Sequence, residues 1–374
     1  MGGQNLKKLR FICIAAALLL LLTACGSTAA APIAEAETPA PAEPIEEAVV
    51  VVETPAPVET PTEEPTEKPT EEPTQAPEPA QEPKEGVIAV NFPDYDTGVD
   101  ADYSYQSDDL RIAINVIETT MPDNTNRQLK ETYYVADIWV RNINGIRTAF
   151  AKGEFNKGTE EGKTLARREN AILAVNGNYN QGLCLHAGKL LKKLRENKGW
   201  NSGAVGILYR DGSLKTFYLK SETLNIEQEI ENGAWYGWQF GPIVIRDYEE
   251  GPGATHYSNM GFKARNILGY YEPGHYVIVT CDNRGEDAQG MNEFMMVDLM
   301  KSLGVKDAFN LDGGTSAVLV FMGEVINHPT TRNDNGTSVS GRPLLDMLVF
   351  GEYDENGNSP DLSSLTPAKF KGRD

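Results

Sequence analysis

The residues best suited to do chemistry are acidic and polar side chains that directly follow apolar segments. The clearest case is the stretch 307–316, in which Asp312 and the pair Gly313-Gly314 come after four mainly apolar positions. The apolar run 317–321 follows, so the pattern predicts two buried strands joined by an acidic corner. Paired glycines let a ligand approach the main chain closely. The same residues also fit an Asp-Gly turn that has no function.

Two further segments place polar residues at the end of an apolar strand. Residues 171–175 lead into Asn176-Gly177, and residues 276–280 lead into Asp282 and Arg284. Asp282 and Arg284 lie two positions apart, so in an extended chain their side chains point to the same face. An asparagine can bind sugar hydroxyls or orient a carboxylate, but Asn-Gly also forms simple turns. The acid and the arginine could equally pair only with each other.

Apolar patterns elsewhere predict the elements that must position these residues. Segments 110–117 and 133–141 alternate as strands do, 204–209 and 214–219 indicate a hairpin, and 290–303 indicates a packed helix. We therefore predict an α+β fold with a mixed, mainly antiparallel sheet and a few packed helices, preceded by a disordered tether. The three polar strand ends should meet at one edge of the sheet.

Residues 235–242 form an unusually aromatic segment, Trp-Tyr-Gly-Trp-Gln-Phe-Gly-Pro. Aromatic faces stack on sugar rings, but packing in a hydrophobic core is their commoner use. The sequence leaves both interpretations open.

The first 25 residues have the pattern of a bacterial export signal. Lys7, Lys8 and Arg10 precede an apolar run at 11–22, which is too short to span a bilayer comfortably. Leu-Thr-Ala-Cys at 22–25 resembles a lipobox, in which the cysteine becomes the lipidated first residue of the mature protein. We therefore expect a lipid on Cys25 and a protein anchored on the outer face of a bacterial cell membrane. An ordinary secretory signal or an uncleaved anchor is the alternative.

Residues 26–86 are rich in Pro, Thr and Glu and contain no Phe, Trp or Tyr. Such a segment cannot bury enough apolar surface to offset its ordering entropy, so we expect a disordered, extended linker. The formal net charge is -20, and much of the acidity lies here. The rest of the chain is also acidic and has no basic run, which argues against nucleic acid as a partner.

Five short motifs occur in the order seen in the phosphodiester glycosidase family, which residues 165–350 resemble. Asn327-His328-Pro329 and Arg342 follow within the same region. The motifs are Asn176-Gly177, Arg265-x-x-x-Gly269, Asp282-x-Arg284, Gly290 before a helix, and Asn310-Leu311-Asp312-Gly313-Gly314-x-Ser316.

The chain departs from the family pattern at three positions. Asn283 and Thr315 stand where glycine is usual, and Asn180 stands where an aromatic residue is usual. None of these changes removes an acid or an arginine, so they bear on substrate fit more than on catalysis.

The resemblance also implies a domain organisation. A catalytic domain would span 161–352, after the signal at 1–25, the linker at 26–86 and an N-terminal part of the globular body at 87–160. A polar C-terminal tail would span 353–374. Residues 87–160 could extend the catalytic domain or form a small lobe.

The implied activity is hydrolysis of the bond between a sugar's anomeric carbon and a phosphodiester oxygen. The substrate would be a carbohydrate phosphodiester, such as an exopolysaccharide or another glycopolymer of the cell surface. Phosphate is a good leaving group, so holding its charge matters most, and Arg265 and Arg284 could do this. Asp282 and Asp312 are the candidates for the base or the nucleophile.

Other matched residues would bind the substrate. Asn176 and Ser316 could bind hydroxyls or phosphate oxygens, and the N–H groups of Gly313 and Gly314 could bind an anion. His328 is a further candidate acid or base. Gly177 and Arg342 complete the expected set.

No cofactor is certain from the sequence. Asp282 and Asp312, with carbonyl oxygens, would suit a hard divalent cation such as Ca²⁺ or Mg²⁺, although no spacing demands one. Cys184 and Cys281 could form one disulfide in an exported protein.

Two other functions stay open. The first is a non-catalytic cell-surface module that binds phosphorylated polysaccharide through the same arginines. The second is a serine hydrolase that uses Ser316, but the chain lacks the Gly-x-Ser-x-Gly elbow and an evident histidine partner.

Overall fold

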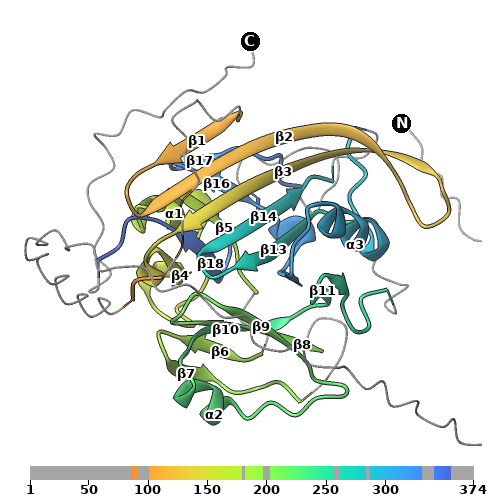
Figure 1. Cartoon of the computed structure of the whole chain (residues 1–374). Coiled ribbons are helices and arrows are strands. Elements are labelled where there is room, and N and C mark those ends of the chain that lie inside the picture. Colours follow the sequence, from red (N-terminus) through yellow and green to blue (C-terminus); the bar gives the residue numbers. More distant parts are fainter. Residues whose placement is uncertain are drawn as a thin grey trace, which may run out of the picture. The chain divides into compact units, whose positions relative to one another are not determined.

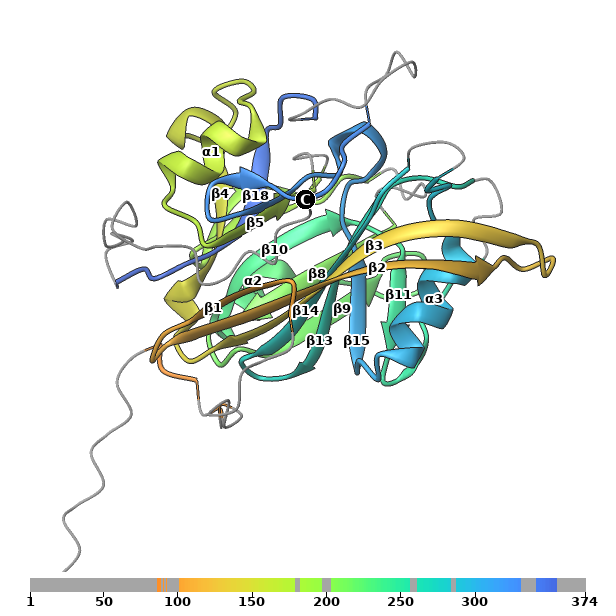
Figure 2. The same cartoon turned by 90° about the horizontal axis from the view of Figure 1, so that it is seen from above.

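Antiparallel strand pairing builds the part of the chain that the computed structural model describes (Figures 1 and 2). The described residues are 86–88, 90, 92, 101–178, 182–196, 203–255, 261–283, 287–330 and 341–354. All of them belong to the unit Pro77–Asp374. The expected signal with Cys25, the linker up to residue 85, most of the C-terminal tail and Arg284 lie outside the described residues.

The first sheet has eight strands in the order β1-β2-β3-β14-β13-β15-β11-β12. β2 and β3 form a long hairpin that curves beside β14 and β13 in Figure 1, and β3 pairs directly with β14. The segment before residue 160 therefore shares a sheet with strands from the second half of the chain. The bounds are β1 Tyr103–Gln106, β2 Leu110–Pro122, β3 Gln128–Val140, β14 His275–Cys281, β13 Arg265–Glu272, β15 Asp307–Asn310, β11 Ile243–Arg246 and β12 Glu249–Glu250.

Two five-stranded sheets complete the described strands. The second sheet has the order β7-β6-β10-β8-β9, and the third has the order β17-β16-β5-β18-β4. Their bounds are β7 Lys189–Lys192, β6 Cys184–His186, β10 Ala234–Phe240, β8 Ala204–Tyr209, β9 Leu214–Tyr218, β17 Glu324–Val325, β16 Leu319–Phe321, β5 Leu173–Asn176, β18 Asp346–Phe350 and β4 Ile146–Phe150.

The helices are short and lie against the sheets. Asn292 caps α3 by accepting a hydrogen bond from the Met295 N–H at 3.0 Å, and the buried face of α3 packs on the first sheet. Helix α1 lies beside the third sheet (Figure 2). No helix within the described ranges is both long and apolar enough to cross a membrane. The bounds are α1 Gly162–Arg168, α2 Ile226–Glu231 and α3 Glu293–Ser302, with 3-10 turns at Ile143–Gly145, Ala151–Gly153 and Gly314–Ser316.

One hydrophobic cluster joins all three sheets. Tyr276 and Phe309 come from the first sheet, Trp238 from the second and Phe350 from the third, and each side chain is almost fully buried. Burial of such large apolar side chains is the main favourable term in packing the sheets together.

The predicted fold class is confirmed in its main feature, because the structure is mostly antiparallel sheet with three α-helices among the described residues. Every pairing between described strands is antiparallel, so the parallel part of the predicted mixed sheet is not found there. The polar strand ends also come from two sheets and not one: β14 and β15 lie in the first sheet, and β5 lies in the third. Alternation along a strand reveals its buried face but not the sheet that it joins.

Glu131 in β3 is a buried carboxyl group, with 1% of its surface exposed. One oxygen accepts a hydrogen bond from the Gly290 N–H at 2.9 Å, and the other has no partner among the described residues. Burial is the main cause that raises the pKa of Glu131 to about 8. The folded protein therefore holds a neutral Glu131 at pH 7.

This raised pKa predicts a pH-dependent loss of stability. Below about pH 4.5 Glu131 is neutral in both states, whereas between pH 4.5 and 8 only the unfolded chain ionises freely, so stability falls as the pH rises. Glu131→Gln should remove this loss and stabilise the protein by about 4 kcal/mol at pH 8 relative to pH 4.5. Urea unfolding of wild type and Glu131→Gln at both pH values measures this difference in the free energy of unfolding. Glu118→Gln, at an exposed position, is the control. A parallel pH dependence in wild type and Glu131→Gln would contradict the assignment.

Candidate active site

The first sheet brings two acidic segments to either side of one strand. At the start of β13, Arg265 pairs with Cys281 of β14, and Asn266 accepts the Leu311 N–H at 2.9 Å on the other side. Asp282 and Asp312 follow directly after these contacts. Two interstrand spacings separate their backbones, which corresponds to about 10 Å.

Asp282 is fully buried and its carboxylate holds the segment that contains His328. One oxygen accepts the His328 N–H at 3.0 Å and the Asn327 side-chain amide at 3.3 Å, and the other lies 3.0 Å from His328 Nδ1. No surface of Asp282 is exposed in this arrangement, and its carboxylate positions His328. A role for Asp282 as base or nucleophile stays a prediction.

His328 is the group of this pair that reaches the surface. Its side chain is 40% exposed, and Nδ1 lies 3.0 Å from Asp282 and 3.2 Å from the Tyr134 hydroxyl. A carboxylate accepts hydrogen bonds, so we assign the ring proton to Nδ1, which leaves the lone pair on Nε2. A histidine that is oriented in this way by a buried acid is suited to general acid and base chemistry.

Asp312 is a second, less buried acid, with 17% of its side chain exposed. Arg342 donates to one oxygen at 3.0 Å, and the Gly313 N–H donates to the other at 2.9 Å. Burial raises the pKa of Asp312, while the Ser316 hydroxyl, Arg342 and the Gly313 N–H oppose this rise. The Arg342 side chain is itself 39% exposed, so this ion pair lies open to solvent on one side.

Asn176 connects the third sheet to the first sheet, and its side chain does not face solvent. Its amide donates to the Asp312 carbonyl at 2.7 Å, and its oxygen accepts the Val318 N–H at 3.2 Å and the Asn266 side-chain amide. The residue is 1% exposed. In this geometry its polar atoms bond groups inside the protein, and the binding of substrate hydroxyls by Asn176 stays a prediction.

Gly177 and Gly313 are glycines because the backbone passes close to other groups. A Cβ at Gly177 would lie 2.5 Å from a carboxylate oxygen of Asp346, and one at Gly313 would lie 2.5 Å from the Ala264 carbonyl. The Gly313 N–H donates to Asp312, and the Gly314 N–H donates to Ala264 at 2.8 Å. The two glycine N–H groups therefore have protein acceptors in this structure, and the backbone anion site stays a prediction.

Arg265 is buried, with 5% of its surface exposed. Its Nε donates to the Met291 carbonyl at 3.1 Å, and one terminal nitrogen donates to the Gly261 carbonyl at 3.0 Å. Burial lowers the pKa of Arg265. These contacts give Arg265 a structural role under the site. Its part in a phosphate clamp stays a prediction, and the second predicted clamp residue, Arg284, lies outside the described residues.

Ser316 lies on the 3-10 turn next to Asp312 and is 1% exposed. Its hydroxyl is near enough to favour the ionised form of Asp312, but it makes no full hydrogen bond among the described residues. The predicted contact of Ser316 with substrate therefore requires the hydroxyl to be uncovered.

Residues 165–350 match the family model of phosphodiester glycosidases. These residues form a domain of the phosphodiester glycosidase family. Apart from Tyr134, every site residue described above lies within the matched range.

The curated relatives that match this chain are distant in sequence. Human N-acetylglucosamine-1-phosphodiester alpha-N-acetylglucosaminidase is 28% identical over 183 residues, which cover 44% of this chain and 35% of the human protein. The SPbeta prophage-derived uncharacterized protein YomE of Bacillus subtilis (strain 168) is 25% identical over 204 residues, covering 52% of this chain and 30% of YomE. The chain thus spans about a third of the length of these curated relatives.

A solved structure shares the fold of this domain. The catalytic domain of the zebrafish N-acetylglucosamine-1-phosphodiester alpha-N-acetylglucosaminidase, described as auto-inhibited by its pro-peptide, aligns with a TM-score of 0.52 at 19% identity. The alignment covers 67% of this chain and 86% of the zebrafish chain.

The described residues of this phosphodiester glycosidase domain also bear on the predicted metal site and the predicted disulfide. No set of three or more His, Cys, Asp and Glu side chains within the described ranges could hold a metal ion. Cys184 and Cys281 are both buried and free. They lie in strands of different sheets, β6 and β14.

Sequence reasoning missed the roles of Tyr134 and Asn327. Tyr134 is one of several apolar and aromatic residues on β3, and nothing in the strand pattern marks it as a neighbour of His328. Asn327 precedes His328 in the matched segment, and this was the one available signal. Its side chain bonds the Leu319 N–H at 2.8 Å as well as Asp282.

The contacts of Asn176 predict a large cost for its removal. Asn176→Ala would leave the Asp312 carbonyl and the Val318 N–H buried without these partners, at a cost of about 2–4 kcal/mol. Urea unfolding of Asn176→Ala measures this cost. Asn232→Ala, at the exposed end of α2, is the matched control and should change stability by less than about 0.5 kcal/mol. Equal small effects of both variants would contradict the connecting role.

Proposed function

We propose that the protein hydrolyses the glycosidic bond of a sugar-1-phosphodiester in an extracellular or cell-surface glycopolymer. The observation that carries the proposal is that a family domain holds two acid-base pairs, Asp282–His328 and Asp312–Arg342, each with one partly exposed member. The human relative is named for its action on an N-acetylglucosamine-1-phosphodiester, which supports this bond type.

The negative charge of the phosphate leaving group explains why a cation, Arg342, lies next to Asp312. When the bond from C1 to the phosphate oxygen breaks, both electrons go to the oxygen and a phosphomonoester forms. Arg342 would hold this negative charge through its exposed guanidinium group. A phosphate leaves readily once its charge is held, so less protonation is needed than for a sugar leaving group.

The attack on C1 requires a base and a negative charge near the sugar. We assign the base to His328 Nε2, which would take a proton from the attacking water while Asp282 stabilises the imidazolium. The water oxygen forms the new bond to C1. Asp312 would face the positive charge that develops on the sugar ring.

The place of action follows from the N-terminal sequence and is part of the proposal. A lipid on Cys25 would anchor the protein to the outer face of a bacterial cell membrane, and residues 26–86 would tether the catalytic domain. Polymers of the cell envelope would then be within reach. A divalent cation such as Ca²⁺ or Mg²⁺ belongs to the proposal only as a group to be tested with a chelator.

The activity assay measures free sugar released from a panel of sugar-1-phosphodiesters, with and without EDTA. Asp312→Asn and His328→Gln should each lower kcat/KM by about 10²- to 10⁴-fold, because each removes a charge or proton acceptor at the reacting carbon. Asp282→Asn should lower kcat more than it raises KM, since it acts through the orientation of His328. Asp298→Asn, on the exposed face of α3, should retain full activity.

The panel also separates the proposal from a binding module. Tight binding of phosphorylated saccharide by wild type, with no sugar released from any substrate, would favour the non-catalytic cell-surface module. Equal activity of wild type, Asp312→Asn and His328→Gln would overturn the assigned residues.

A further inference from the structure

A cavity of about 340 Å³ lies at the edge strand β4 of the third sheet. Its lining residues come from β4, from β6 and β10 of the second sheet, and from the residue that follows α1. This volume is in the lower part of the range of small-molecule sites, roughly 300–1,000 Å³. None of its lining residues belongs to the candidate active site, so the cavity is a separate feature of the domain.

One wall of the cavity is aromatic. Trp235, Tyr236, Phe150 and His186 all line it. The rings of His186 and Phe150 lie 5.0 Å apart, and those of His186 and Tyr236 lie 5.4 Å apart. Such a set of rings offers flat faces and edges to the C–H groups of a sugar.

A β-bulge explains how two consecutive aromatic residues reach the same cavity. In a regular strand Trp235 and Tyr236 would point to opposite faces. In β10 the partners of Ala234 and Tyr236 are the consecutive residues Tyr209 and Leu208, so Trp235 is an extra residue in the strand. Bulges redirect side chains in this way and are frequent next to functional sites.

The indole of Trp235 also carries an unused donor. Its N–H is buried and has no hydrogen-bond partner among the described residues. The Arg210 guanidinium group lies over the ring at 4.1 Å from its centroid and fixes it. A buried indole N–H normally has an acceptor, so its signal is sensitive to changes in the packing around Trp235, which lines the cavity.

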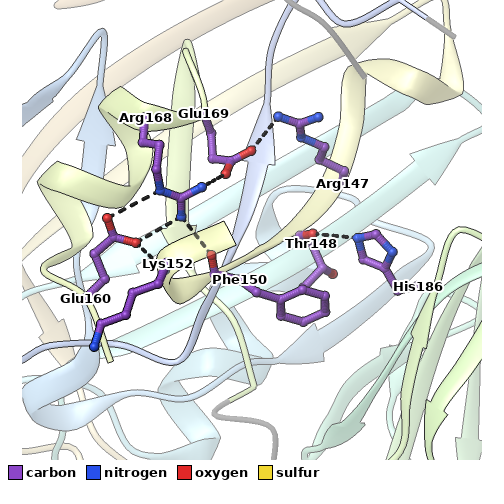
Figure 3. A network of polar contacts seen from close by, with 8 residues as sticks. All are labelled: Arg147, Thr148, Phe150, Lys152, Glu160, Arg168, Glu169 and His186. Carbon is purple, nitrogen blue, oxygen red and sulfur yellow. Dashed lines mark hydrogen bonds and ion pairs between the residues drawn. The ribbon is translucent and has the colours of Figure 1, made fainter. Parts of the chain in front are cut away.

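Other lining residues are polar. Arg147 donates to Glu169 at 2.5 Å, and both side chains are mostly buried, with 19% and 14% exposed. The guanidinium group of Arg147 also stacks on the Tyr353 ring at 3.8 Å. In Figure 3 the Glu169 carboxylate lies between Arg147 and Arg168, and Arg168 continues to Glu160 and the Phe150 carbonyl. The network holds the acid and the arginine in fixed positions.

His186 is held as a neutral ring. Its Nε2 lies 3.0 Å from the Thr148 carbonyl, which can only accept a hydrogen bond, so Nε2 carries the proton (Figure 3). Burial lowers the pKa of His186. With His186 neutral, the charged residues that line the cavity are Arg147, Glu169 and Asp354. This balance does not favour an anion.

We propose that this cavity binds a neutral sugar unit of a saccharide, at a site separate from the active site. Aromatic rings, a fixed donor and acceptor pair and no excess positive charge in the lining match an uncharged polyhydroxylated ring better than a phosphate or an apolar molecule. The ligand class rests on the proposed function, since a polymer-degrading enzyme gains from holding a second unit of its substrate.

The test is an NMR titration that records the indole N–H signals of the full chain labelled with ¹⁵N-tryptophan. Trp235 is assigned from the signal that is lost in Trp235→Phe. Titration with maltose, cellobiose and N,N′-diacetylchitobiose should shift the Trp235 signal in a saturable way for at least one sugar. The signal of Trp139, whose N–H donates to Asp137 on β3, should not move.

Two glutamates provide a matched pair of variants. Glu169→Gln should weaken the sugar-dependent shift by about tenfold, because Glu169 lines the cavity. Glu324→Gln removes a carboxylate that also pairs with an arginine but lies outside the cavity, and it should leave the shift unchanged. Unaltered signals of the other indoles confirm that each variant is folded.

Each outcome separates this inference from the proposed function, because sugar release from a sugar-1-phosphodiester is measured on the same sample. A saturable Trp235 shift that Glu169→Gln weakens supports the cavity site, with or without sugar release. No shift with any of the sugars, a shift that both variants share equally, or a shift with inorganic phosphate alone would overturn it, even where hydrolysis proceeds.

Discussion

The side-chain amide of Asn176 is the interaction on which the geometry of this site depends. It lies at the end of β5 in the third sheet, yet it bonds the backbone of Asp312, which follows β15 in the first sheet. Its oxygen also holds the Val318 N–H, so the chain before and after the acidic corner is tied to one buried group. An amide suits this place because it is both donor and acceptor and adds no charge to the interior.

A second buried polar group, Asp282, plays the corresponding part for His328. A carboxylate without exposed surface is costly unless its oxygens are bonded, and here backbone, amide and imidazole groups bond them. Fully buried groups therefore fix the geometry of the site, while His328, Arg342 and part of Asp312 reach solvent. Positioned groups of this kind stabilise charge at the reacting atoms without rearranging during the reaction.

The sequence predicted where polar groups follow strands, because strand alternation and glycine corners are local signals. The strands that carry Asn176, Asp282 and Asp312 were predicted from them, and the helix at 290–303 was found as α3, Glu293–Ser302. The roles of the individual site residues were harder to predict from the sequence. Nothing local shows that Asn176 bonds the backbone of Asp312, that Arg265 bonds the Met291 carbonyl, or that Asp282 lies behind His328. Each of these contacts joins residues that are distant in the sequence. The bulge at Trp235 likewise depends on the register of β10 against β8.

The most direct test of the account is the position of bond cleavage. Hydrolysis of a sugar-1-phosphodiester in H₂¹⁸O, followed by mass spectrometry of both products, shows which atom the water attacks. The account predicts ¹⁸O at C1 of the released sugar and none in the phosphomonoester, because His328 and Asp312 are assigned to attack at carbon and Arg342 to the departing phosphate. Label in the phosphomonoester would mean cleavage of a P–O bond and would contradict the assignment of the site as a glycosidase.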